Sequence, residues 1–196
     1  MPTESSFEVI CLSDFIESPD DEDFFKNMSL SFSSKNKDVE RFLQEKAVQS
    51  AKLGTSSTYL LVYKGIAPQI LGYFTLAIKI LSIRKSNLSK SVERIIGRFG
   101  YFDENSNAYH LPAILIAQFG RNFNKDSNTI SGTDLMSITL KYVKDILRRT
   151  SGKTVFLECE KKQKLIEFYS DLGFISLDNQ VISKDSKELM QMYRLV

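Results

Sequence analysis

The sequence contains little cysteine and little histidine. Among its 196 residues there are two cysteines, Cys11 and Cys159, and one histidine, His110. Two cysteines so far apart in sequence do not make the disulfide framework of a small secreted domain, and their spacing is not that of a metal site. We therefore expect reduced thiols, no bound metal and a cytoplasmic protein.

Long hydrophobic runs are also missing. No apolar run approaches the roughly 20 residues that a transmembrane helix needs. The N-terminus has neither the basic nor the apolar segment of a signal peptide. There is no internal repeat and no low-complexity tract. These absences favour a globular protein without a membrane partner, and the length suits a single domain, residues 1–196.

Neither sign of charge dominates. The formal net charge is +2, which is too small to indicate nucleic-acid or membrane binding by itself. The charge is unevenly placed, however, with an acidic segment at residues 14–23 and a basic one at 79–98. Solvated surface is the simplest interpretation of both segments.

The most informative stretch runs from Leu111 to Leu147. It begins with a wholly apolar run, 113–117, which predicts a strand buried on both faces. A polar segment containing glycine and a loop follow. Ser131 and Asp134 have the spacing of a capping box and predict the start of a long amphipathic helix. Such a start attracts anions, although most capped helices bind nothing and the Asp134 carboxylate competes for the same amides.

Hydrophobic periodicity predicts strands and helices on both sides of this stretch. The predicted strands are 7–12, 58–63, 70–78, 154–159, 174–182 and 189–196. The predicted helices run from Asn36 to Gly54, within 86–99 with Ser86 or Asn87 as the cap, and over 165–172 before Gly173. The acidic segment is predicted as loop. Strands 58–63 and 70–78 should form an antiparallel hairpin.

This order predicts a mixed α/β fold of α+β character, antiparallel at both ends of the chain. The strands around Ile114 and Val155, joined by a helix, should be parallel neighbours with a right-handed crossover. Residues 79–110 are predicted as a helical insertion. Gly120 predicts a bulge that parts its strand from the parallel neighbour.

Three stretches carry a resemblance to a known family. The first is the strand–loop–helix from Gln118 to Gly132. The second is LIEFYSDLGF at 165–174, an aromatic pair followed by a Gly-Phe strand start. The third is FLQEKA at 42–47 through TSSTY at 55–59. Over nearly the whole chain these stretches resemble the GNAT superfamily of N-acetyltransferases, especially the branch of toxins that acetylate the α-amino group of aminoacyl-tRNA.

The resemblance implies a three-layer GNAT-like fold with a central mixed, mostly antiparallel sheet. One parallel pair is splayed into a cleft for acetyl-CoA, the acetyl donor. In the family, the strand end holds pantetheine through its backbone, and the loop and helix start hold the pyrophosphate. The residues so implied here are Gln118, Phe119, Gly120, Arg121, Thr129, Ile130, Ser131, Gly132, Thr133, Asp134 and Phe168.

The phosphate loop departs from the family pattern. The family usually has Arg or Gln, two residues, Gly, one residue, and Gly or Ala, whereas residues 127–132 read Ser-Asn-Thr-Ile-Ser-Gly. Gly132 matches, but Ile130 replaces the other glycine. Isoleucine adopts a positive φ with difficulty. A weakened, reshaped or lost cofactor site therefore stays open, with the hydroxyls of Thr129, Ser131 and Thr133 as substitute donors.

The resemblance also implies catalytic residues. Tyr169 matches the tyrosine that the family places at the start of its last crossover helix, where it protonates the departing thiolate. A tyrosine with an ordinary pKa of about 10 is suited to that task, although periodicity alone has Tyr169 completing an apolar helix face. Glu158 and Glu160, at a strand end, are candidate bases. His110 is expected to be structural, and nothing in its spacing supports a pair with Cys159.

The predicted function is an acetyl-CoA-dependent N-acetyltransferase acting on a primary amine of an unidentified acceptor. Its narrower version is a toxin that acts on charged tRNA, pairs with a small antitoxin and contacts phosphates through the basic segment 79–98. One alternative is a non-catalytic GNAT-like binding module with a degenerate phosphate loop, and another is a partner-binding protein that uses the insertion. A homodimer is a further predicted assembly.

Overall fold

The computed structural model describes residues 7–65, 67–124, 129–182 and 188–196. The chain forms two compact units, which we describe separately. The first comprises Met1–Ala77 and Ala117–Lys141, and the second Ile78–Ile116 and Tyr142–Val196. The strand order is β1-β2-β3-β5-β6-β8-β7, with β4 beside β5. No described helix combines the length and apolarity that a bilayer crossing requires.

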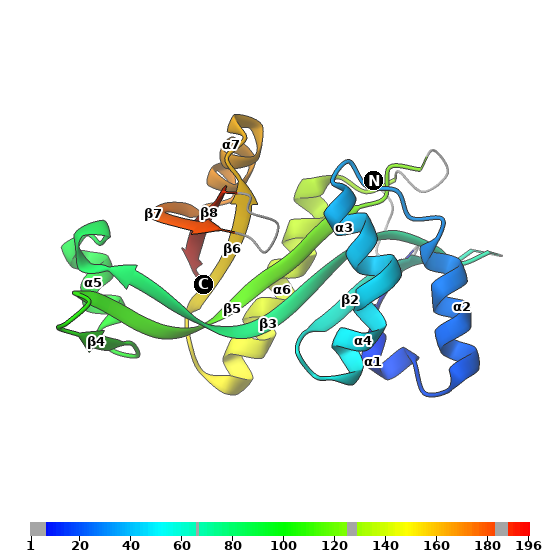
Figure 1. Ribbon diagram of the computed structural model, residues 1–196, viewed down its shortest axis with the longest axis horizontal. Helices are drawn as coiled ribbons and strands as arrows, with labels where there is room; N and C mark the ends of the chain where they lie inside the picture. The colour runs from blue at the N-terminus through cyan, green and yellow to red at the C-terminus, as the bar shows by residue number, and fades with distance from the viewer. Residues whose placement is uncertain (1–6, 66, 125–128, 183–187) are drawn as a thin grey trace. The chain divides into compact units, whose positions relative to one another are not determined.

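The elements are, in chain order, β1 (Phe7–Cys11), α1 (Leu12–Phe15), α2 (Pro19–Ser29), α3 (Lys37–Arg41), the π-helix η1 (Phe42–Lys46), α4 (Ala47–Lys52), β2 (Ser57–Tyr63), β3 (Gln69–Arg84), the 3₁₀ helix η2 (Lys85–Asn87), α5 (Lys90–Ile96), β4 (Tyr101–Asp103), β5 (Ala108–Arg121), α6 (Gly132–Thr150), β6 (Thr154–Glu160), α7 (Gln163–Asp171), β7 (Ile175–Ile182) and β8 (Glu188–Leu195). Figure 1 shows them as a ribbon.

In the first unit, the acidic segment is helical rather than a loop, so that prediction is wrong. Ser18 caps α2: its amide donates to the Asp21 carboxylate over 2.8 Å, and its hydroxyl oxygen accepts from the Asp21 amide. Pro19 stands at the first helical position, where a missing N–H costs nothing. Carboxylates in a first turn are favoured by the helix dipole. The hydrogen bond from the Ser18 side chain lowers the pKa of Asp21.

The predicted helix from Asn36 to Gly54 is confirmed. Asn36 caps α3 by accepting from the Asp38 amide over 3.0 Å, and α3, η1 and α4 follow one another without a break. Gly54 ends the run with φ +62°, a conformation that favours glycine. The π-turn at Phe42–Lys46 was not predicted.

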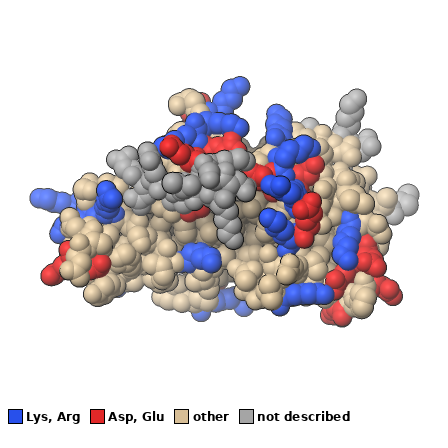
Figure 2. Space-filling model, in the orientation of Figure 1, with Lys and Arg blue, Asp and Glu red and all other residues tan. Residues whose placement is uncertain are grey.

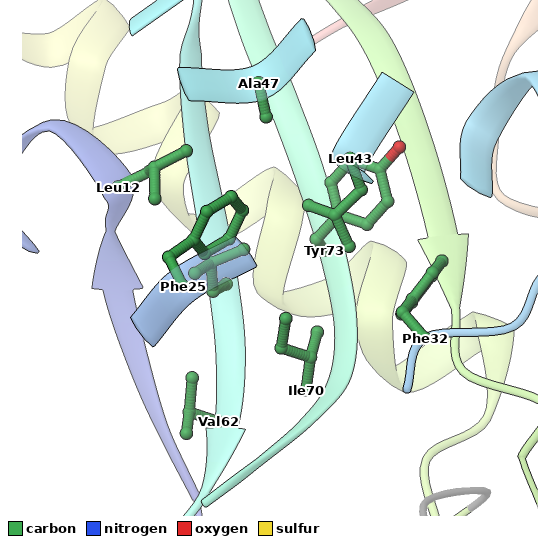
Figure 3. Packing of buried hydrophobic residues seen from close by; sticks show 9 residues of the cluster. Leu12, Phe25, Phe32, Leu43, Ala47, Val62, Ile70 and Tyr73 are labelled. Atoms are coloured by element: carbon green, nitrogen blue, oxygen red, sulfur yellow. The ribbon is translucent and has the colours of Figure 1, made fainter. Parts of the chain in front are cut away.

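These helices cover the antiparallel strands β1, β2 and β3. The predicted hairpin is confirmed, with Tyr63 opposite Gln69. Figure 3 shows the core between helices and strands, where Phe25, Leu43 and Tyr73 are fully buried. The Tyr73 hydroxyl donates to the Val39 carbonyl over 2.5 Å, which satisfies its polar end and ties α3 to β3.

In the second unit, both strands that flank the predicted insertion extend into it. β3 continues to Arg84 instead of ending at Ile78, and β5 begins at Ala108. The predicted helix is present as α5, but Ser89 caps it rather than Ser86 or Asn87. The predicted insertion also contains β4, which pairs with β5.

The remaining strands of this unit follow the prediction. β5 and β6 are parallel, with Ile114 opposite Val155. β8 pairs antiparallel with both β6 and β7, which confirms the antiparallel pairing predicted for the end of the chain. Gly173, after α7, has φ +80°, as expected of a residue that ends a helix.

Candidate active site

The parallel ladder between β5 and β6 is short. Its register covers Ile114–Ile116 on β5 and Val155–Leu157 on β6, whereas β5 continues to Arg121 and β6 to Glu160. The ladder therefore ends before either strand does. Residues 118–121, the polar segment after the apolar run, belong to β5.

In the first unit, the predicted capping box of α6 is confirmed. The Ser131 hydroxyl oxygen accepts from the Asp134 amide over 3.0 Å, and the Asp134 carboxylate accepts from the amide and hydroxyl of Ser131. That carboxylate is engaged at the cap. Within the described parts of the chain, the amides of Gly132 and Thr133 have no acceptor, and amides at a helix start favour an anion.

Ile130 lies just before this cap and is 3% exposed. It is not among the described residues with positive φ, so its backbone adopts a conformation that suits isoleucine. Its carbonyl accepts a hydrogen bond from the Arg121 guanidinium over 3.0 Å. The buried Ile130 side chain therefore holds the segment before α6 in place, and the hydrogen bond from Arg121 on β5 fixes its backbone.

Arg121 also lies over the ring of Phe123, with 4.3 Å from its guanidinium carbon to the ring centroid. The Lys35 ammonium lies 4.7 Å from the same centroid. Two cations thus contact the Phe123 ring, and one of them, Arg121, also donates to the Ile130 carbonyl. Lys35 and Phe123 were not predicted as site residues, because Lys35 precedes α3 and only tertiary structure brings it to Phe123.

Asn122 holds this arrangement together. Its fully buried side chain accepts from the amides of Ser33 (3.0 Å) and Asn124 (2.9 Å) and donates to the Ile70 carbonyl (2.8 Å). The Phe123 amide donates to the Ser33 carbonyl over 2.8 Å. These bonds fix the segment before Lys35 against the end of β5.

Gly120 is required by packing, whether or not the predicted bulge is present. β5 runs on through it to Arg121, and a Cβ at Gly120 would lie 2.5 Å from Val39 Cγ1. A side chain there would collide with α3. Gln118 and Phe119, just before it, are half-buried, and Thr129 and Thr133 are exposed.

The second unit holds the predicted catalytic residues. Glu158 accepts from the Gln191 amide nitrogen over 2.9 Å, and Glu160 forms an ion pair with Lys162. Cys159, between them, is buried, and its thiol lies 4.0 Å from the Met192 sulfur. Burial first, and then the Glu160 charge, raise the pKa of Cys159 to about 11.

Tyr169 lies in the last turn of α7, not at its start as predicted. Its ring meets Phe168 and Phe174 edge to face, with centroids 5.1 and 6.0 Å apart. Burial, and to a lesser extent Cys159, raise the pKa of Tyr169 well above its ordinary value. The side chain therefore keeps its proton at any physiological pH, and it also completes the apolar face of α7.

His110 contacts Ser82 rather than Cys159. Its Nδ1 lies 2.8 Å from the Ser82 hydroxyl, and its Nε2 lies near Ser106 and Asp103. The histidine thus ties β5 to β3 and to the turn after β4. Among the described residues, no group of three His, Cys, Asp or Glu side chains is placed to hold a metal ion.

The predicted residues therefore form two groups, one per unit: Gln118–Arg121 and Thr129–Asp134 in the first, and Glu158, Glu160, Phe168 and Tyr169 in the second. The first group offers amides and cations, which suit a phosphate. The second offers a protonated phenol and two carboxylates, which suit proton transfer.

Comparison with known proteins gives likeness in structure only. No family model matches the sequence, and no curated protein matches it. A tyrosine-to-phenylalanine variant of KacT is 19% identical, with 95% of each chain covered and a TM-score of 0.66. AtaT complexed with acetyl-methionyl-tRNAfMet is 19% identical, with 94% of this chain and 93% of AtaT covered and a TM-score of 0.65.

The chain has the GNAT-like fold. A third similar structure is an AtaT mutant toxin bound to the C-terminus of the antitoxin AtaR and acetyl-CoA; it is 14% identical, with 97% of this chain and 93% of that one covered and a TM-score of 0.61. The mixed sheet with its parallel β5–β6 pair, predicted from the sequence, is thus confirmed. At such identities the likeness establishes the fold alone.

Proposed function

We propose that this protein is an acetyl-CoA-dependent N-acetyltransferase whose acceptor is a primary amine, specifically the α-amino group of an aminoacyl-tRNA. The observation that carries the proposal is the set of anion-binding groups at the start of α6. There, the Gly132 and Thr133 amides follow Ile130, whose carbonyl accepts a hydrogen bond from Arg121, by two and three residues. The complexes of AtaT with acetyl-methionyl-tRNA and with acetyl-CoA support the choice of donor and acceptor.

The phosphates of the donor require positive charge and N–H donors, and the degenerate loop supplies neither a glycine at position 130 nor a leading arginine. We propose that Arg121 and Lys35, stacked on Phe123, supply the missing charge. Arginine and lysine are the usual partners of phosphate. Gly132 and Thr133 contribute main-chain amides, which an altered side chain does not remove.

Acetyl-CoA brings an activated thioester, so the protein has to supply positioning and proton transfer. Glu158 or Glu160 accepts a proton from the ammonium group of the acceptor, directly or through water, and the neutral amine then attacks the thioester carbonyl. Tyr169 holds the proton that the leaving sulfur takes up. Because its pKa is raised, Tyr169 remains a proton donor across the working pH range.

A charged-tRNA acceptor also requires a basic surface. The side chains of Lys79, Arg84, Lys90, Arg94 and Arg98 are exposed, whereas Lys85 is paired with Glu93 at 3.0 Å. We propose that the exposed cations contact tRNA phosphates. We further propose that the protein is a cytoplasmic toxin and that a small antitoxin neutralises it, because AtaT is bound by the antitoxin AtaR.

The function is tested by incubating the protein with acetyl-CoA labelled in the acetyl group and a set of aminoacyl-tRNAs. We expect label on the amino acid of at least one charged tRNA and none on uncharged tRNA. A binding module would take up acetyl-CoA without transferring the label. Acetylation of free amines with no transfer to any charged tRNA would refute the tRNA acceptor while leaving the enzyme class intact.

Replacement of Lys35 tests the cation pair. We expect Lys35→Gln to weaken acetyl-CoA binding about fivefold, because a charge-assisted contact to phosphate contributes roughly 1 kcal/mol or more. Isothermal titration calorimetry measures the change. Lys46→Gln, the same substitution at another exposed lysine of the first unit, is the control and should bind as wild type. Equal affinities for all three proteins would contradict a phosphate contact by Lys35.

A further inference from the structure

A cavity in the first unit is not used by the proposed reaction. It has a volume of about 430 Å³, and its lining includes Phe24, Asn27, Met28, Pro68, Gln69 and Asn124. These residues come from α2, from the start of β3 and from the segment just after β5. The volume lies in the range of small-molecule sites.

The lining combines amide groups with an exposed aromatic ring. Asn27, Gln69 and Asn124 each carry a carboxamide, which offers hydrogen-bond donors and an acceptor. Phe24 is 49% exposed, although it contacts Phe15 with ring centroids 6.1 Å apart. A ring left so accessible can stack on a flat ligand. None of the described lining residues is charged.

Several features fix the lining in place. The Asn124 side chain donates to the Ser31 carbonyl over 3.3 Å, and its main-chain amide donates to Asn122. Gln69 is paired in the β2–β3 ladder opposite Tyr63. Helix α2 is held by the Ser18 capping box. The carboxamides are thus carried by segments that are already ordered, which lowers the entropic cost of binding.

Helix α2, which supplies part of the lining, is acidic at its start. Helix α2 carries four carboxylates, at Asp20, Asp21, Glu22 and Asp23, and one cation, Lys26. Figure 2 shows acidic side chains gathered at the lower right, where α2 lies in Figure 1. Glu22 and Asp23 are paired with Lys52 and Lys26. A phosphate group that faced α2 would therefore meet unfavourable charge, whereas Lys35 and Arg121 lie on Phe123, the residue before Asn124.

We propose that this cavity binds a nucleobase, either of a free nucleoside or of an unpaired RNA nucleotide whose phosphates lie outside it. Bases present donor and acceptor edges that carboxamides recognise and faces that stack on aromatic rings. Phe24 provides the stacking surface, and Asn27, Gln69 and Asn124 read the edge. The proposal concerns binding alone and does not depend on acetyl transfer.

Saturation-transfer NMR with adenosine, guanosine, cytidine and uridine tests the proposal on the full chain. We expect transfer to at least one base, with millimolar affinity, and a loss of about fivefold in Phe24→Leu, since stacking of a base on an aromatic ring contributes at least ~1 kcal/mol. Leu30→Ala, at an exposed leucine beside α2 that does not line the cavity, is the matched control and should bind as wild type.

Further arms identify the source of the base. A trinucleotide that binds more tightly than any nucleoside would indicate RNA as the source, and the reverse order a free nucleoside. Asn27→Ala should reduce the preference among bases if Phe24→Leu fails to fold. No transfer from any nucleoside, or transfer that neither variant changes, would overturn the proposal.

Discussion

We expect the Tyr169→Phe variant to lose about a hundredfold of its kcat while binding acetyl-CoA as tightly as wild type, because loss of a positioned general acid typically costs 10² to 10⁴ in rate. Phenylalanine keeps the ring that packs against Phe168 and Phe174. The substitution therefore removes the hydroxyl group that would donate the proton and preserves the packing of the ring on α7. Steady-state kinetics, with a thermal-shift titration of acetyl-CoA on the same preparations, separates the two effects.

Tyr193→Phe is the control for this variant. Tyr193 is also a buried tyrosine of the second unit whose pKa is raised by burial, but it lies on β8 outside the proposed site. Its replacement should leave kcat within about twofold of wild type. Similar losses in both variants would show that Tyr169 acts through packing.

The pH profile gives a second readout of the same residue. Burial favours the neutral phenol, so the folded-state pKa of Tyr169 lies above the ordinary value of about 10. The associated stabilisation is complete below the unfolded pKa and is lost as pH rises through the folded pKa. Activity should therefore show no alkaline decline due to Tyr169 below about pH 10. A decline near pH 8 that disappears in Tyr169→Phe would contradict this assignment.

The second large effect is on stability. Asn122→Ala removes the acceptor for the Ser33 and Asn124 amides and the donor to the Ile70 carbonyl from a fully buried position. Buried polar groups left unsatisfied cost about 1 to 3 kcal/mol each, so we expect a loss of about 3 kcal/mol. Denaturant unfolding should show a lower midpoint with an unchanged slope.

The same variant should also bind acetyl-CoA more weakly, since Asn122 fixes the segment that carries Lys35. Asn105→Ala, at an exposed asparagine of the turn after β4, is the control and should change neither quantity. A loss of less than about 1 kcal/mol would mean that water or a neighbouring side chain satisfies the exposed partners.

Local signals in the sequence predicted the local features of the fold. The Ser131–Asp134 spacing identified the start of α6, and Gly54 and Gly173 identified helix ends, because a cap or a positive φ depends on a few adjacent residues. The uninterrupted apolar run at 113–117 identified a buried strand. Each of these features depends only on residues that are close together in the sequence.

The wrong predictions concern two charged stretches, the acidic segment that contains α2 and the part of β3 after Ile78. The acidic residues after Pro19 stabilise the start of α2 through the helix dipole, and Ser18 was not recognised as its cap. The strand predicted over 70–78 continues past Lys79 to Arg84. The strand continues with Leu81 and Ile83 buried and Ser82 and Arg84 exposed, the alternation of a half-buried strand.

The sequence predicted only those parts of the candidate site that lie within one continuous segment. The residues of β5, α6 and α7 could be assigned by resemblance, but the contact of Lys35 with Phe123 joins segments that no short pattern connects. Likewise, Ile130 was expected to strain a glycine position, whereas it is buried without a positive φ. The Lys35–Phe123 contact and the burial of Ile130 both depend on tertiary packing, which no local pattern reports.

Calorimetric titration of the protein with acetyl-CoA tests the central claim most directly. The account predicts saturable binding at one site per chain, with a thermal stabilisation of about 2.7 kcal/mol when the ligand is a hundredfold above Kd. It also predicts that Lys35→Gln weakens this binding and that Tyr169→Phe does not. The absence of binding and of any thermal shift at millimolar acetyl-CoA would contradict it.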